Sequence, residues 1–455
     1  MTTPEADGLA TPQRYWAMLV IALTIMMAVL DGSIANVALP TIAKDMHATP
    51  ADSIWVVNAY QLVITILLLP LASLGEIVGY RRVYRAGIVL FTLASLGCAL
   101  SDSILTLSAA RVVQGIGAAG VMSVNAALVR FIYPSRLLGR GIGIIALVVA
   151  VSAAAGPTVA AAILSIASWP WLFAVNVPIG IATLALAHML PRTPRSGRRF
   201  DIPSALLNAL FFGLLIVGID SIGHGGRPLY AVLAFLGAGL SCVALVRRQL
   251  PQAAPLLPVD LLRIPMFALS IATSVCSFAA QMLAYVSIPF YFQHLLGRSD
   301  VATGLLMTPW PLAAAVAAPI AGRLADRYPA GMLGALGLAT FAVGLVLLAL
   351  LPAAAGDADI VWRMALCGAG FGLFQSPNNR AIITSAPRER SGGASGMLGT
   401  ARLLGQTMGA ALVALMFSLF GGNATVWALG LAAGIALLAA AVSYSRLVGS
   451  SRANG

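Results

Sequence analysis

The sequence has 455 residues, of which 60% are hydrophobic and only 9% are charged. Soluble domains carry about 25% charged residues, so this composition excludes water as the main solvent of the chain. The formal net charge of +12 would suit a nucleic-acid partner, and the positions of the arginines decide whether it indicates one.

Apolar runs of about 20 residues, the length that crosses ~30 Å of hydrocarbon, recur along nearly the whole chain. The first run is too long for a signal-peptide core, so we expect it to be retained as a helix. The sequence predicts an all-α membrane protein with fourteen transmembrane helices. Their expected ranges are 15–39, 53–73, 83–101, 104–129, 141–165, 171–190, 202–222, 228–246, 267–293, 301–322, 331–352, 360–384, 392–420 and 424–445.

Two stretches rich in arginine and proline, Pro191–Asp201 and Arg247–Pro265, bracket a pair of predicted helices. We therefore expect a six-helix bundle at 1–190, a linker with two additional transmembrane helices at 191–265, and a second six-helix bundle with a cytoplasmic tail at 266–455. An internal repeat supports this division, since Ala72–Glu76 and Gly322–Asp326 follow corresponding helices 250 positions apart.

The basic residues are concentrated in alternate loops, because 21 of the 27 lysines and arginines fall on one predicted side. Only Lys44, Arg227 and Arg298 lie in the intervening loops. This positive-inside pattern predicts cytoplasmic termini and a multi-pass protein of a bacterial inner membrane. The basic excess therefore reflects topology, and we expect the lipid bilayer, not a nucleic acid, as the partner.

No motif for ATP use or hydrolysis is present. Lys44 is the only lysine and does not belong to a phosphate-binding GxxxxGK[ST] loop. The four histidines are far apart, and neither HExxH nor GxSxG in a suitable context occurs. We expect no enzymatic activity and no cofactor other than a proton gradient, which leaves secondary transport or a channel.

A charge buried in a bilayer costs about 2.5–3.5 kcal/mol or more, so each example requires a reason. Asp31 is the only acidic residue that lies well inside a predicted span. It precedes Val37 by six residues, and Arg111 follows Ile104 by seven, which puts both ~9–11 Å below the outer surface. Asp31 and Arg111 are thus either a structural ion pair or a proton and cation site, and the otherwise acid-free interior favours the second.

Further polar and aromatic residues lie in the predicted spans, and each would either line a cavity or bond to a neighbouring helix. These are Asn58, Tyr60, Gln61, Asn125, Gln281, Tyr285, Asn378 and Asn379. Glycine-rich stretches around Gly115 and Gly156 permit close approach of helices, which is more often a packing feature than a functional one.

Five segments in order resemble the major facilitator superfamily, specifically its fourteen-helix drug:proton antiporter branch. Leu30–Pro40 is similar to LDxTIVNVALP, Trp55–Tyr60 to the opening of helix 2, Arg111–Gly117 to RxxQGxG, Asn176–Gly180 to NVPIG, and Gly399–Gly405 to NTxRQLG. The resemblance covers the chain from about Tyr15 to Arg446.

Two motifs depart from the family pattern. In the loop motif GxLADRxGRR, Glu76 replaces the aspartate and Ile77 replaces an arginine. The antiporter motif GPxxGG reads Gly156-Pro157 followed by Ala160 and Ala161, so both trailing glycines are absent.

The resemblance implies two six-helix bundles around a midplane cavity that opens alternately to each side. It implies that Asp31 and Arg111 couple proton and substrate, and that the polar residues of the spans line the substrate cavity. It further implies a set of conformational residues: Glu76, Gly79, Arg81, Arg82, Gln114, Gly115, Gly156, Pro157, Asp326, Arg327 and Arg402.

The expected function is proton-coupled export of lipophilic, cationic drugs or biocides. Export of an endogenous metabolite or siderophore is the alternative, and a channel is a third. The expected partner is a small-molecule substrate, and we expect a monomer, with a periplasmic adaptor and an outer-membrane channel as candidate partners.

Overall fold

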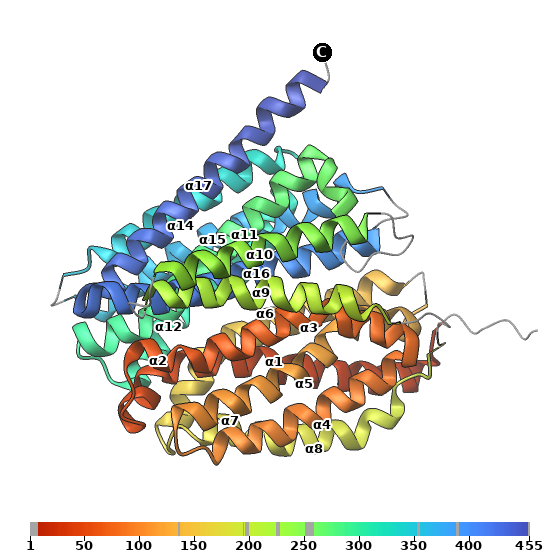
Figure 1. Cartoon of the computed structure of the whole chain (residues 1–455), viewed down its shortest axis with the longest axis horizontal. Helices are drawn as coiled ribbons and strands as arrows, with labels where there is room; N and C mark the ends of the chain where they lie inside the picture. The colour runs from red at the N-terminus through yellow and green to blue at the C-terminus, as the bar shows by residue number, and fades with distance from the viewer. Residues whose placement is uncertain are drawn as a thin grey trace, which may run out of the picture.

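The structure is a computed structural model, which describes residues 8–453 except 135–136, 194, 196–199, 224–227, 251–258, 353–354 and 388–390. The regular elements of the described residues are helices, and most of them run roughly parallel or antiparallel across one bundle (Figure 1). The described part of the chain is therefore all-α, as the long apolar runs of the sequence predict.

The first group of helices covers the N-terminal part of the chain. Its members are α1 (Thr11–Asp45), α2 (Pro50–Ser53), α3 (Trp55–Val78), α4 (Tyr80–Ala99), α5 (Ile104–Ile132), α6 (Leu138–Leu164), α7 (Trp171–Ala174) and α8 (Asn176–Leu186). Within this group α5 packs against both α3 and α4, α1 packs against α6, and α4 packs against α8.

The second group follows a pair of helices, α9 (Ile202–Gly223) and α10 (Pro228–Gln249), that pack on each other. Its members are α11 (Pro265–Phe290), α12 (Asp300–Met307), α13 (Pro309–Leu324), α14 (Ala330–Ala349), α15 (Asp357–Ser385), α16 (Ser391–Phe420) and α17 (Ala424–Ala453). Here α15 packs against α13 and α14, while α11 packs against α16 and α17.

The two groups share one packing arrangement. A Cβ added to Gly117 of α5 would lie 2.5 Å from the backbone nitrogen of Phe91 on α4. A Cβ added to Gly370 of α15 would lie 2.5 Å from the backbone nitrogen of Phe341 on α14. Both helix pairs therefore approach closely through glycine, at positions about 250 residues apart, which is the offset of the sequence repeat.

The bundle has two distinguishable ends. We call the end where α3 meets α4, with Arg81, Arg82 and Arg85, the arginine end; α1 begins on this side, at the right of Figure 1. The other end, where α1 runs into α2, is the opposite end. The helix pair α9 and α10 lies between the two groups, and α9 contacts both α3 and α16.

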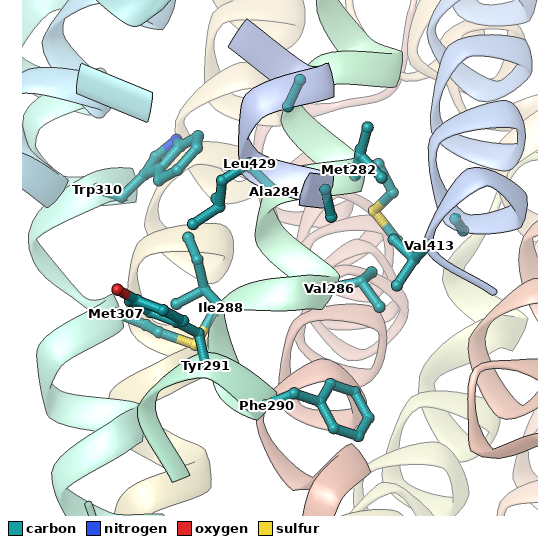
Figure 2. Close-up of a cluster of buried hydrophobic side chains, with 14 of the residues drawn as sticks. Met282, Ala284, Val286, Ile288, Phe290, Tyr291, Met307, Trp310, Val413 and Leu429 are labelled. Atoms are coloured by element: carbon teal, nitrogen blue, oxygen red, sulfur yellow. The ribbon is translucent and has the colours of Figure 1, made fainter. Parts of the chain in front are cut away.

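The largest buried apolar cluster extends over both groups, and its α11 part is shown in Figure 2. Ile288 and Tyr291 lie near Met307 there, while Met282 of α11 lies near Val413 of the neighbouring α16. Close packing on this scale fixes the helix positions and so fixes the polar residues that the helices carry.

The end of the first helix and the number of candidate membrane spans differ from the expected values. The first helix does not end near residue 39, because α1 continues through Pro40 to Asp45. Twelve segments of the described residues are long and apolar enough to span a membrane; one of them, Gly396–Leu447, combines α16 with α17, and α15 is not among the twelve. The count of fourteen and the side on which the termini lie stay predictions.

Candidate functional site

A buried ion pair joins α1 to α5. The start of α5 is fixed by Ser103 and Thr106, each of which accepts the backbone N–H of the other through its hydroxyl, at 3.3 and 3.1 Å. Arg111 lies two turns into α5, ~10 Å along its axis. Its Nη1 pairs with Oδ2 of Asp31 on α1, and both side chains are 0% exposed.

Two amides complete the coordination of Asp31. The Oδ1 atom accepts hydrogen bonds from Gln114 Nε2 at 2.8 Å and from Asn176 Nδ2 at 2.9 Å. Gln114 also accepts a bond from Arg111 Nη1 at 2.6 Å, so Asp31, Arg111 and Gln114 form a closed ring. Sequence reasoning did not select Asn176 as a site residue, although the NVPIG segment that contains it was recognised.

Aromatic rings enclose the guanidinium of Arg111. Its central carbon lies 4.0 Å from the ring centre of Tyr60 on α3 and 5.6 Å from that of Phe173 on α7. Its Nε donates to the carbonyl of Val56 at 2.9 Å, whereas its Nη2 is buried without a partner among the described residues. Arg111 is therefore held by α1, α3, α5 and α7 together.

This cluster can respond to a change of charge. Removing one member of a buried ion pair costs about 3–5 kcal/mol, because the remaining charge has no solvent to compensate it. A movement that separates α1 from α5 would therefore favour protonation of Asp31 or its neutralisation by another cation. The arrangement can exchange one positively charged partner for another at a single carboxylate.

Polar side chains also join the two helix groups. Tyr285 on α11 bonds to Ser33 of α1, with 3.2 Å between the two hydroxyl oxygens. Gln61 on α3 donates to Gln406 on α16, also at 3.2 Å. The hydroxyls of Thr65 and Thr407 are 2.8 Å apart. Two of the predicted cavity residues, Tyr285 and Gln61, thus lie between the groups.

The other predicted cavity residues are dispersed. Asn58 and Asn125 are buried, and the Oδ1 atom of each has no hydrogen-bond partner among the described residues. Gln281 and Asn379 are partly exposed. The substrate-cavity role of these residues, and of Tyr60, stays a prediction.

Asn378 belongs to a second buried network that the sequence did not reveal. Its Oδ1 accepts a bond from Arg446 Nη1 at 2.8 Å, and its Nδ2 donates to Ser274 Oγ, also at 2.8 Å. Arg446 donates further to Ser270 at 2.8 Å and to Ser443. The positive-inside pattern places Arg446 among the 21 basic residues of the cytoplasmic side, yet it is only 2% exposed.

A family model described as the Major Facilitator Superfamily matches residues 21–405 and 269–454. The chain belongs to the Major Facilitator Superfamily. It is also 62% identical over 450 residues to the "Uncharacterized transporter YebQ" of Escherichia coli (strain K12), covering 98% of each chain.

Two further relatives have names that state a substrate or role. The chain is 31% identical to "Riboflavin transporter RibZ" of Clostridioides difficile (strain 630), covering 89% of each chain. It is 30% identical to "Multidrug resistance protein Stp" of Mycobacterium tuberculosis (strain CDC 1551 / Oshkosh), covering 87% of this chain and 74% of that protein. The solved structure of a D-xylose-proton symporter shares the fold, with a TM-score of 0.68 at 14% identity, over 94% of this chain and 97% of that one.

In this Major Facilitator Superfamily transporter, the residues with a predicted conformational role lie at several places in the structure. Gly115 approaches the carbonyl of Tyr60, which would lie 2.9 Å from an added Cβ. A Cβ added to Gly156 would meet the side chain of Ser33 on α1, and one added to Gly304 of α12 would meet the carbonyl of Pro157. These glycines allow α5 to meet α3 and α6 to meet α1 and α12.

The charged members of the set lie mainly at the arginine end. Asp326, just after α13, pairs with Arg380 of α15, whereas Glu76 and Arg327 are exposed. Arg402 lies within α16, 5.5 Å from the ring centre of Phe278. The conformational roles of all of these residues stay predictions.

Two cavities are present at the arginine end, with volumes of ≈ 380 and ≈ 370 Å³. Arg380 and Arg446 line the first, and Gly79, Arg81 and Arg82 line the second. None of the eight residues predicted to form the substrate cavity lines either of them.

Proposed function

We propose that this Major Facilitator Superfamily transporter exports lipophilic, cationic drugs or biocides in exchange for protons. The observation that carries the proposal is the burial of Asp31, the one buried carboxylate among the side chains that the structure describes. Once it is separated from Arg111, this single negative charge can be neutralised by a proton or by a cationic substrate, but not by both at once. Because the proton and the cationic substrate compete for that charge, binding of one releases the other.

The partners of Asp31 supply the coupling to conformation. Arg111 is anchored to α3 through Val56, and Asn176 approaches from α8. Movement of these helices relative to α1 would withdraw donors from the carboxylate, so that it accepts a proton. The return movement restores Arg111 and expels the proton. Each conformational cycle then exchanges one class of cation for the other.

The contacts between the two groups suggest which side is closed. Ser33 with Tyr285, Thr158 with Thr308, and Pro157 with Gly304 all lie toward the opposite end. The positive-inside bias assigns the arginine end and both termini to the cytoplasm. We infer a state closed toward the outside, in a bacterial inner membrane, from which a cytoplasmic substrate can enter.

The export direction is supported by Stp, the relative named a multidrug resistance protein. RibZ, the relative named a riboflavin transporter, supports a metabolite as the substrate, which is the substrate class of the second candidate. We further propose a monomeric transporter that works without a cofactor, to which a periplasmic adaptor and an outer-membrane channel could connect.

Proteoliposomes test the proposal. Purified protein would be reconstituted with an imposed pH gradient and no ATP, and movement of tetraphenylphosphonium or riboflavin would be followed. We expect gradient-driven movement of tetraphenylphosphonium by the wild type and its loss in Asp31→Asn. Asp359→Asn is the matched control, since Asp359 also pairs with an arginine, Arg363, but near the start of α15.

Transport of riboflavin without tetraphenylphosphonium would select the metabolite exporter. Movement of either compound down its own gradient at the same rate with and without the pH gradient would contradict proton coupling.

A further inference from the structure

The cavity of ≈ 370 Å³ at the arginine end has a strongly basic lining. It lies between the start of α4 and the segment that follows α8. Five arginines contribute to its wall, together with Thr193: Arg81, Arg82, Arg85, Arg192 and Arg195. No carboxylate is among its lining residues.

Backbone and side-chain contacts fix this wall. Gly79 precedes α4 with a φ of 99°, a conformation that favours glycine, and so turns the chain into the helix. The backbone N–H of Tyr80 then donates to Thr193 Oγ1 at 2.9 Å. Arg81 Nη2 donates to the carbonyl of His188 at 2.9 Å. The two segments that hold the arginines are thereby tied together.

The positive charge of the cavity has no paired carboxylate in the part of the chain that the structure describes. Among the ion pairs of the described residues, none includes any of the five arginines. The Nε atom of Arg81 is buried and has no hydrogen-bond partner there. The first cavity differs, because Arg380 is paired with Asp326 and Arg446 is bonded to neighbouring side chains.

Guanidinium groups bind phosphate oxygens in bidentate, charge-assisted geometry, so five of them in one cavity favour a phosphate group. The surface next to the cavity indicates where that phosphate comes from. Arg82 and Arg85 lie on the same exposed stripe of α4 as Leu93 and Leu96, which follow Arg85 at ~12–17 Å along the helix axis. These two leucines are 63% and 44% exposed, which suits contact with acyl chains.

From this juxtaposition we propose that the cavity binds the phosphate of an anionic phospholipid, whose acyl chains lie along α4. The arginines stand at the membrane boundary, where basic pockets between helices receive lipid headgroups. A bound lipid would join the start of α4 to the segment after α8. The proposal does not depend on the transported substrate.

Native mass spectrometry of the purified full chain tests it, with dioleoylphosphatidylglycerol and dioleoylphosphatidylcholine as probes. We expect the wild type to prefer the anionic lipid. The triple variant Arg82→Gln, Arg85→Gln, Arg195→Gln should lose about a hundredfold in affinity for it, since each arginine near an anionic lipid surface contributes about fivefold. The matched control removes Arg130, Arg140 and Arg323, three exposed arginines that do not line the cavity.

Equal affinity of the triple variant and the wild type, or an equal loss in the control, would overturn the proposal. So would thermal stabilisation by inorganic phosphate combined with no preference between the lipids, which would assign the cavity to a soluble phosphate. If the glutamine variant does not fold, the corresponding lysine variant and the salt dependence of wild-type binding decide. If the affinity for the anionic lipid did not change with salt concentration, a charged binding site would be contradicted.

Discussion

Helices α5 and α15 occupy equivalent positions in the two groups, but only α5 carries a buried charge. Both have 29 residues, and both approach a neighbouring helix through glycine. Arg111 is the eighth residue of α5, and Met364 is the eighth of α15. Their partner helices, α1 and α11, differ in the same way. Asp31 lies nine residues before the internal proline of α1, and Ala280 lies nine residues before the internal proline of α11.

The comparison shows that this packing does not require the polar cluster. The second group packs its helices with methionine and alanine at these positions, whereas the first group retains an ion pair whose burial is costly. Retention of such a pair where apolar side chains suffice argues for a role in coupling, and the purely structural interpretation of Asp31 and Arg111 becomes weaker.

The largest effect is expected from making α5 resemble α15. Arg111→Met leaves Asp31 without its counter-charge and should lower the free energy of unfolding by about 3–5 kcal/mol. The double variant Asp31→Ala, Arg111→Met imitates the second group and should recover most of that loss while remaining unable to couple transport to protons. Thermal unfolding and proteoliposome assays measure the two properties, and recovery of proton-driven transport in the double variant would refute the comparison.

A smaller effect is expected at the shared glycines. Gly117→Ala and Gly370→Ala should each cost about 1–3 kcal/mol, because the added methyl group meets the backbone of the facing helix. Gly239→Ala on α10 is the control, since nothing lies within 4 Å of its added Cβ. Apparent melting temperatures would show this, and tolerance of alanine at only one of the two sites would break the equivalence.

A further effect is expected at Arg446, which belongs to the buried polar network of the second group. Arg446→Leu leaves Asn378 Oδ1 unpaired and should cost about 1–2 kcal/mol of stability. Proton-driven transport should remain, unlike in the Asp31 variants. The exposed Arg323 offers the control Arg323→Leu. Transport lost without any change in melting temperature would show that the second network, not the first, carries the coupling.

The smallest effect is expected between the groups. Thr65→Val removes the hydrogen bond to Thr407 and should cost about 1 kcal/mol or less. Because this bond joins α3 to α16, its loss should increase the accessibility of a cysteine placed nearby to reagents added from outside. Thr92→Val is a control within one group, since Thr92 bonds to its own helix. Unchanged accessibility would exclude a role of this contact in closing the outer side.

The sequence predicted the helical membrane fold, the family and the residues of the central ion pair. Long apolar runs identify helices because their length is set by the bilayer, and one acid in an acid-free interior is conspicuous. Depth counting paired Asp31 with Arg111, although α1 extends beyond the end that the count assumed.

Other features could not be predicted because they depend on which helix faces meet. Asn176 reaches Asp31 from a helix 145 residues away in the chain, and amides carry no charge that marks them in an apolar span. Arg446 resembles every other loop arginine until α17 is packed against α11 and α14, which brings its side chain to Asn378 of α15. The arginine cavity likewise requires two segments, around residues 81 and 193, to be placed side by side.

The most direct test of the central claim is the proton movement caused by substrate. Proteoliposomes that enclose a pH-sensitive dye would receive tetraphenylphosphonium on one side, with no pH gradient imposed. The account predicts that the wild type moves protons opposite to the cation, whereas Asp31→Asn, folded and stable, moves none. Proton movement of wild-type size in Asp31→Asn would contradict the account and place the exchanged charge elsewhere.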